Sequence, residues 1–133
     1  MEKEFVPYEI ALALKELGFD EPCFAIYYQG KFMNGKIEHY VWNLVNSIKT
    51  NTDTNSIDIV TAPLYQQAFR WLRKKYKLDG WVVPYFSLDG KKYSYLILNE
   101  KMRSLEDELN VGNYEEAELE CLKKLIEVVK NGK

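Results

Sequence analysis

The feature that most constrains this chain is a pair of apolar runs, residues 81–87 and 92–98, on either side of Asp89 and Gly90. Asp-Gly is a favoured two-residue hairpin loop, because both residues tolerate positive φ. The pattern therefore predicts two long antiparallel strands joined by a tight turn.

The two-residue period of a strand sorts the side chains of this hairpin onto two faces, and both faces are apolar. With Asp89-Gly90 as the loop, Ser87 faces Lys92. One face carries Val82, Phe86, Tyr93, Tyr95 and Ile97, and the other carries Trp81, Val83, Tyr85, Leu96 and Leu98. Pro84 indicates an edge strand, because proline cannot donate to a ladder on one side. Such a hairpin predicts a covering element or a second subunit.

Three segments have helical patterns, at residues 7–17, 64–76 and 114–130. Pro7 suits the first helical position, and Gly18 suits a left-handed C-terminal cap. Asn113 and Glu116 have the spacing of a capping box at the start of the third helix.

The remaining β-rich runs, residues 23–28 and 37–44, predict a first hairpin around Asn34-Gly35. Gly30 supplies a competing turn, so the register of this hairpin stays open. Residues 46–56 are polar and have no apolar period, and we interpret them as a mobile loop.

These elements follow the order α-β-β-α-β-β-α. The predicted fold class is α+β, with an antiparallel sheet of about four strands (two hairpins) packed with three helices. The chain has 133 residues, of which 47% are hydrophobic and 14% aromatic, enough for one core but cramped for two. We therefore predict a single domain over residues 1–133.

Charge and cysteine content narrow the classes of partner. The formal net charge of −2 creates no global attraction to nucleic acid or to anionic lipid. Cys23 and Cys121 lie far apart and form no CxxC motif, so two free thiols in a reducing compartment are the simpler interpretation. No stretch approaches the ~20 apolar residues of a membrane helix, and we predict a cytoplasmic location.

The strongest positive signal for binding is the basic face of the second helix. Its residues are Gln66, Gln67, Arg70, Arg73 and Lys74, with Lys75 and Lys77 close by. Such a face can grip phosphates, with nearby aromatic rings to stack bases. A solvated helix face whose cations complement the helix dipole is the simpler interpretation.

Catalytic and metal-binding patterns are weak in this sequence. A Cys–His nucleophile would need His39, the only histidine, with Cys23 or Cys121. Cys121 lies mid-stripe on an amphipathic helix, where a cysteine is usually an inert core residue. Metal-ligand spacings such as HExxH and CxxC are absent, as are glycine-rich phosphate loops. We predict no catalytic residue, metal site or cofactor.

Aromatic residues supply the candidate interface, because a domain this small cannot bury every ring. Its members are the aromatic residues Tyr8, Trp81, Tyr85, Tyr93 and Tyr95, together with the aliphatic Leu12. A two-fold homodimer would let such a surface cover itself.

Three stretches carry a family resemblance: PYEIALALKELGFDEPC at 7–23, APLYQQAFRWLRKK at 62–75 and YEEAELECLKKLIEVV at 114–129. Together they resemble a family of small uncharacterised proteins encoded by phages and mobile elements of gut anaerobes. The resemblance implies an accessory or interaction role and carries over no activity, cofactor or catalytic residue. The favoured function is thus a non-enzymatic interaction protein that binds itself or a protein partner. The alternative is a nucleic-acid-binding module that uses the second helix, and a small enzyme ranks third.

Overall fold

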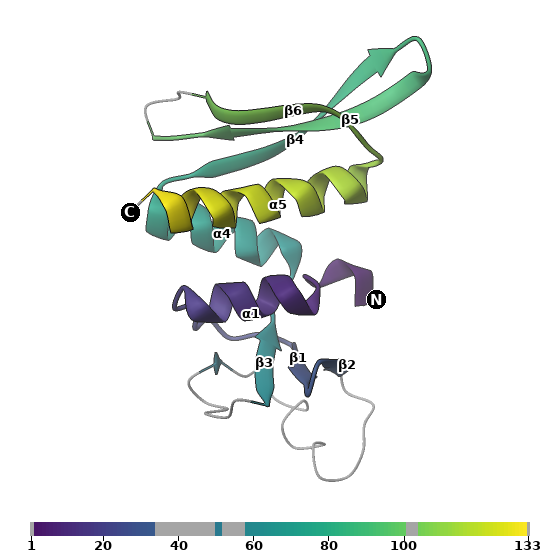
Figure 1. Ribbon diagram of the computed structural model, residues 1–133. Helices are drawn as coiled ribbons and strands as arrows, with labels where there is room; N and C mark the ends of the chain where they lie inside the picture. Colours follow the sequence, from purple (N-terminus) through teal and green to yellow (C-terminus); the bar gives the residue numbers. More distant parts are fainter. Residues whose placement is uncertain (1, 34–49, 52–57, 101–103, 133) are drawn as a thin grey trace. The chain divides into compact units, whose positions relative to one another are not determined.

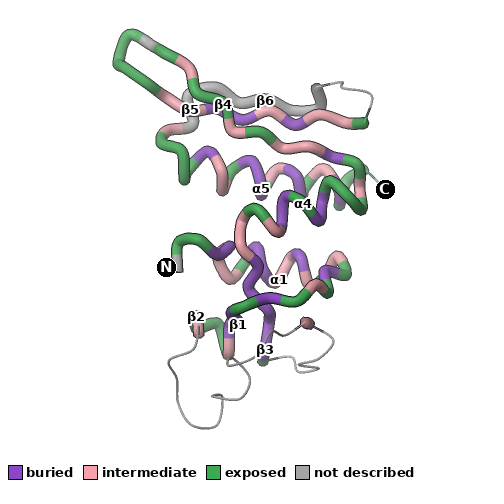
Figure 2. The backbone as a smooth tube through the Cα atoms, turned by 180° about the vertical axis from the view of Figure 1, so that it is seen from behind, coloured by how far each residue is buried: buried purple, intermediate pink, exposed green. Residues whose placement is uncertain are grey.

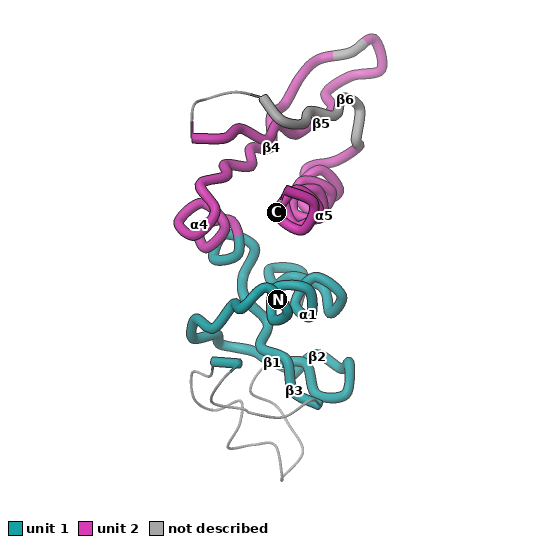
Figure 3. Tube along the Cα trace, turned by 60° about the vertical axis from the view of Figure 1, so that its left-hand side comes forward, with its two compact units in different colours: residues 1–68 teal, residues 69–133 magenta. Residues whose placement is uncertain are grey.

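The computed structural model describes residues 2–33, 50–51, 58–100 and 104–132. Its chain divides into two compact units, residues 1–68 and 69–133 (Figure 3). The boundary falls within helix α4 (Tyr65–Tyr76). The prediction of one domain stays a prediction, and each unit is described by itself.

Unit 1 is a short antiparallel sheet packed with a helix (Figure 1). Its elements are η1 (Glu2–Glu4), α1 (Tyr8–Glu16), β1 (Ala25–Tyr28), β2 (Lys31–Met33) and β3 (Ile59–Ala62), with strand order β2-β1-β3. All four residues of β3 are buried, and α1 packs against this strand. A four-residue strand that is buried throughout has no polar alternation, which is why the sequence pattern did not predict it.

The first hairpin turns at the competing glycine. Gln29 and Gly30 both have positive φ, 51° and 81°, and connect Tyr28 directly to its partner Lys31. Two consecutive left-handed residues match the right-handed twist of the flanking strands. The predicted strand at 37–44 and its turn at Asn34-Gly35 lie outside the described residues, as does most of the predicted loop at 46–56.

Helix α1 ends as the sequence predicts. Gly18 adopts φ 99°, and the Phe19 amide donates to the Leu14 carbonyl at 2.9 Å, as in a Schellman motif. Pro7 lies one position before the predicted one, at the N-cap itself. The helix buries Ile10, Ala11 and Leu14.

Unit 2 consists of the C-terminal part of α4, a three-stranded antiparallel sheet and a long helix. The sheet has the order β4-β5-β6, formed by β4 (Asp79–Ser87), β5 (Gly90–Leu98) and β6 (Ser104–Gly112), and α5 (Tyr114–Asn131) lies along one of its faces (Figure 1). The hairpin β4–β5 extends beyond the first turn of α5.

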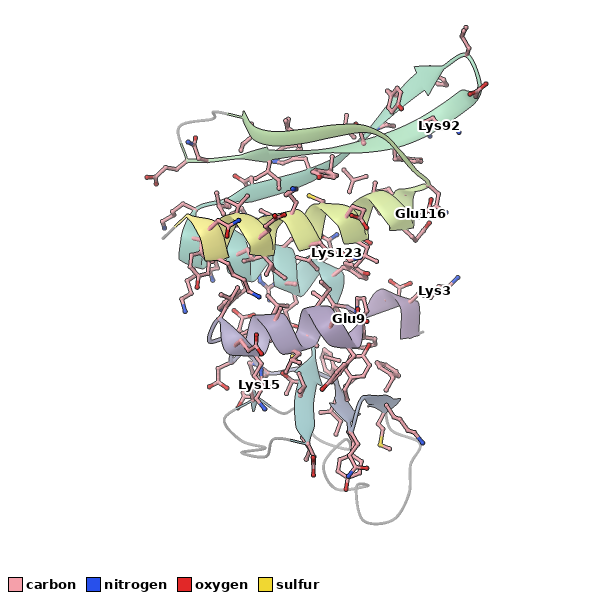
Figure 4. The ribbon with its side chains drawn as sticks, in the orientation of Figure 1. Lys3, Glu9, Lys15, Lys92, Glu116 and Lys123 are labelled. Carbon is pink, nitrogen blue, oxygen red and sulfur yellow. The ribbon has the colours of Figure 1, made fainter. Side chains whose placement is uncertain are left out.

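The predicted capping box fixes the start of α5. The Asn113 side chain accepts from the Glu116 amide at 2.8 Å, and the Glu116 carboxylate accepts from the Asn113 amide at 2.9 Å. Glu116 is labelled in this first turn in Figure 4. The buried stripe of the helix comprises Ala117, Cys121, Leu122, Leu125, Ile126 and Val129.

The α+β class and its three main helices are confirmed. Three of the four predicted strands correspond to β1, β4 and β5, and the fourth, at 37–44, lies outside the described residues. The structure adds β2, β3 and β6, which were not predicted. The strands divide into two separate sheets, one in each unit. The longest of the unpredicted strands, β6, contains the acidic run Glu106-Asp107-Glu108, which has low β-propensity. Pairing with β5 determines its conformation, with Leu96 opposite Asp107.

Candidate interaction surface

The β4–β5 hairpin has the predicted faces, although its register differs by two residues. Ser87 pairs with Gly90, and the two-residue loop is Leu88-Asp89 in place of Asp89-Gly90. Gly90 has φ 112° and therefore provides the left-handed residue just after the loop. Because the side-chain period is two, a shift of two residues leaves every side chain on its predicted face.

One face of the hairpin packs against α5. Tyr95 and Ile97 on this face are buried, and Gly80 lies so close to the helix that a Cβ there would meet Leu125 and Cys121. The glycine therefore permits the close approach of strand and helix. Towards the loop, the Tyr93 ring packs edge-on against Tyr114, with ring centroids 5.5 Å apart.

The opposite face of the hairpin is open within unit 2. Trp81 is 56% exposed and Val83 is 36% exposed, and Tyr85, Leu96 and Leu98 are only partly buried (Figure 2). Ser94 on the same face is buried, and its hydroxyl donates to the Val83 carbonyl at 3.2 Å. We call these six residues the open face. Lys92, opposite Tyr85, and Asp79, opposite Leu98, lie on the same side of the hairpin, so the open face is mainly apolar between these two positions.

Pro84 lies in β4, which is an edge strand among the described strands, as predicted. Ser87 and Gly90 flank the two-residue loop, so this pair exchanges backbone hydrogen bonds and every second residue of β4 does the same. Pro84 falls between those positions, and its nitrogen faces outward. The missing N–H costs the sheet nothing and removes one donor from the exposed edge.

The six residues of the predicted interface do not form one surface. Trp81 and Tyr85 belong to the open face, whereas Tyr93 and Tyr95 lie on the face towards α5. The other two, Tyr8 and Leu12, belong to α1 in unit 1 and are partly buried. Tyr8 packs edge-on against Tyr27, with ring centroids 5.5 Å apart.

Two exposed apolar residues at the hairpin tip were not among the predicted interface residues. Phe86 and Leu88 are almost fully exposed, although Phe86 lies on the same face as Tyr95. This part of the hairpin, where Figure 4 labels Lys92, extends beyond α5, so no helix covers Phe86. The position of Phe86 next to the predicted turn is the sequence feature that could have indicated its exposure.

The predicted basic face of α4 is partly engaged in local contacts. The Arg73 guanidinium lies 3.7 Å from the Asp79 carboxylate, and the Lys75 ammonium lies 5.1 Å from the centre of the Trp71 ring. The Gln67 side chain belongs to unit 1, where its amide donates to the Pro22 carbonyl at 2.7 Å.

The other predicted members of this face, Gln66, Arg70 and Lys74, are exposed on α4. Gln66 and Gln67 lie in unit 1, whereas the three cations lie in unit 2.

Both cysteines are buried free thiols. Burial is the main cause that raises the pKa of Cys23 to about 12. Burial likewise raises the pKa of Cys121 to about 12, opposed by a hydrogen bond with the Trp81 backbone. A protonated, inaccessible thiol is a poor nucleophile, which agrees with the prediction that Cys121 is inert. His39, the other member of the hypothetical catalytic pair, lies outside the described residues.

No family model, curated protein or solved structure matches this chain significantly. None of the described helices is long and apolar enough to cross a membrane. Within the same described ranges, no three His, Cys, Asp or Glu side chains gather as metal ligands would.

Proposed function

We propose that this chain is a small non-enzymatic interaction protein whose partner is a second copy of itself, bound through the open face of unit 2. The observation that carries the proposal is the exposure of Trp81 and Val83 on the face turned away from α5. Aromatic and aliphatic residues grouped on one exposed sheet face are typical of the centre of a protein interface.

A two-fold axis would place two open faces against each other, so that each copy covers the other's Trp81. Antiparallel sheets pack in this way about 10 Å apart, with their side chains interdigitated. Pro84 supports contact between faces over contact between edges, because it leaves the outer edge of β4 short of a donor.

The expected contribution of Trp81 follows from its exposure. A tryptophan presents roughly 250 Å², so 56% exposure leaves about 140 Å² to be buried on association. At about 25 cal/mol per Å² this is worth roughly 3.5 kcal/mol for each copy, so the loss of one Trp81 side chain corresponds to about 300-fold in the dissociation constant and the loss of both to more.

The proposal also includes an accessory role in the cytoplasm. The two unpaired thiols support a reducing compartment. The resemblance of residues 7–23, 62–75 and 114–129 to small phage and mobile-element proteins supports an accessory role.

Sedimentation equilibrium on the wild type and two variants tests this proposal. At micromolar concentration we expect wild-type protein to have twice the 15.7 kDa monomer mass and Trp81→Lys to be a monomer. Phe24→Lys is the matched control, because Phe24 is 59% exposed but lies in unit 1, and it should leave the dimer intact. A wild-type monomer, or equal effects of the two substitutions, would refute the proposed interface.

A further inference from the structure

The outer edge of β3 is occupied by side chains. Among the described strands of unit 1, β3 lies at one edge of the sheet and pairs with β1. The Gln29 amide donates to the Asp58 carbonyl at 2.8 Å, which fixes the phase of the ladder. Val60 and Ala62 therefore bond to β1, whereas the backbone groups of Ile59 and Thr61 point away from it.

Side chains bind two of these four outward groups. The Thr61 amide donates to Asn51 Oδ1 at 3.0 Å, and Lys15 Nζ donates to the Ile59 carbonyl at 3.0 Å. Lys15 reaches this edge from the last turn of α1, where Figure 4 labels it.

Asn51 is itself held in place. It is buried, and its amide nitrogen donates to the Phe19 carbonyl at 2.8 Å. The Phe19 backbone is fixed in turn by its bond to the Leu14 carbonyl at the end of α1. Both side chains on the β3 edge are therefore anchored to α1 or to the turn that follows it.

A strand edge of this composition is prone to pair with a strand of another chain. Ile59, Val60 and Thr61 are β-branched, and an exposed row of N–H and C=O groups is a template for strand addition by another chain. A donor and an acceptor occupied by side chains are no longer free for a second strand.

We propose that Asn51 and Lys15 block the outer edge of β3, so that a second copy of this chain cannot add a strand there. We call these two side chains the guards. The two side chains occupy one donor, the Thr61 N–H, and one acceptor, the Ile59 C=O, that an added antiparallel strand would bond. They confine self-association to surfaces other than this edge.

Hydrogen exchange at single amides tests the guards directly. Asn51→Ala should accelerate exchange of the Thr61 amide by about tenfold, since one net hydrogen bond is lost. The Val60 and Ala62 amides, which bond to β1, should keep their protection. Asn51→Asp is the matched control, because it retains an acceptor for Thr61 while losing the donor to Phe19, and Thr61 should stay protected.

Association is the second readout, measured in a Trp81→Lys background so that the proposed dimer of unit 2 does not contribute. In that background, Asn51→Ala with Lys15→Met should form larger species by sedimentation, whereas Trp81→Lys alone should not. Faster Thr61 exchange without new association would overturn the role as guards. Slow labelling of the buried Cys23 thiol verifies that unit 1 remains folded, and Lys15→Met alone repeats the test if Asn51→Ala unfolds it.

Discussion

Gly80 is the position at which we expect one added methyl group to lower the stability of the fold most clearly. A Cβ there would lie 2.7 Å from Leu125 Cδ1, 2.8 Å from Cys121 Sγ and 3.0 Å from Phe69 Cε1. All three contacts are shorter than ordinary van der Waals distances. The backbone of Gly80 is not in the left-handed region, so the effect of Gly80→Ala is one of packing.

The magnitude follows from two opposing effects. Overpacking a tight core costs about 1–3 kcal/mol, and the reduced entropy of the unfolded chain returns about 0.4–1 kcal/mol. We expect Gly80→Ala to lower the free energy of unfolding by roughly 1–2 kcal/mol. For a chain of 133 residues this lowers Tm by about 3–10 °C.

Urea unfolding of a double-mutant cycle with Leu125→Ala measures this effect. Leu125→Ala alone costs about 2–5 kcal/mol, but the space it leaves accepts the new methyl group. Gly80→Ala should therefore cost less in that background, with a coupling of about 1 kcal/mol or more. Gly30→Ala is the control: its Cβ meets nothing within 4 Å, and its cost comes from φ 81° and should not depend on Leu125. A Gly80→Ala protein as stable as the wild type, or equal costs in both backgrounds, would refute this account of the packing.

Two further predictions concern the thiols and the basic face. Burial raises the pKa of Cys23 and Cys121 from 9.0 to about 12, so the folded chain retains protons that the unfolded chain releases above pH 9. The contribution of these protonated thiols to the free energy of unfolding is complete below pH 9 and is lost as pH rises towards 12. Over this range the free energy of unfolding falls with a limiting slope of about 1.4 kcal/mol per pH unit for each thiol. Urea unfolding between pH 9 and pH 12 measures how the free energy of unfolding depends on pH. This dependence should be weaker in the double variant Cys23→Ala with Cys121→Ala than in the wild type, and an unchanged dependence would contradict the raised pKa of the two thiols. For the basic face, we expect no measurable binding of DNA or RNA at physiological salt. Tight binding that weakens with salt and disappears in Arg70→Glu with Arg73→Glu would instead favour the nucleic-acid function.

The sequence predicts periodic features of this fold better than the positions of its turns. The faces of the β4–β5 hairpin are correct even though the loop is Leu88-Asp89, because a two-residue slip preserves alternation. Turn positions depend on a choice between nearby glycines, and Gly30 forms the first hairpin. Strand β6 could not be predicted from its composition, because pairing with β5 overrides the low β-propensity of its acidic residues.

The candidate site shows the same division between local pattern and tertiary packing. Alternation places Trp81 and Tyr95 on opposite faces, but it does not say which face a helix covers. Basic residues on α4 were predicted from helical periodicity. The pairing of Arg73 with Asp79 depends on the turn after the helix, and that of Gln67 with Pro22 depends on a segment 45 residues earlier in the chain. Such contacts require the fold itself.

Gly80 links the core of unit 2 to its candidate interface. The helix packs on the face that carries Gly80, where the missing side chain lets α5 approach β4. Trp81, the next residue, must point to the other face because successive strand residues alternate. The close contact between Gly80 and α5 thereby leaves Trp81, the largest side chain of β4, on the uncovered face, where it is 56% exposed. The packing choice that stabilises unit 2 is therefore also the choice that creates its apolar open face.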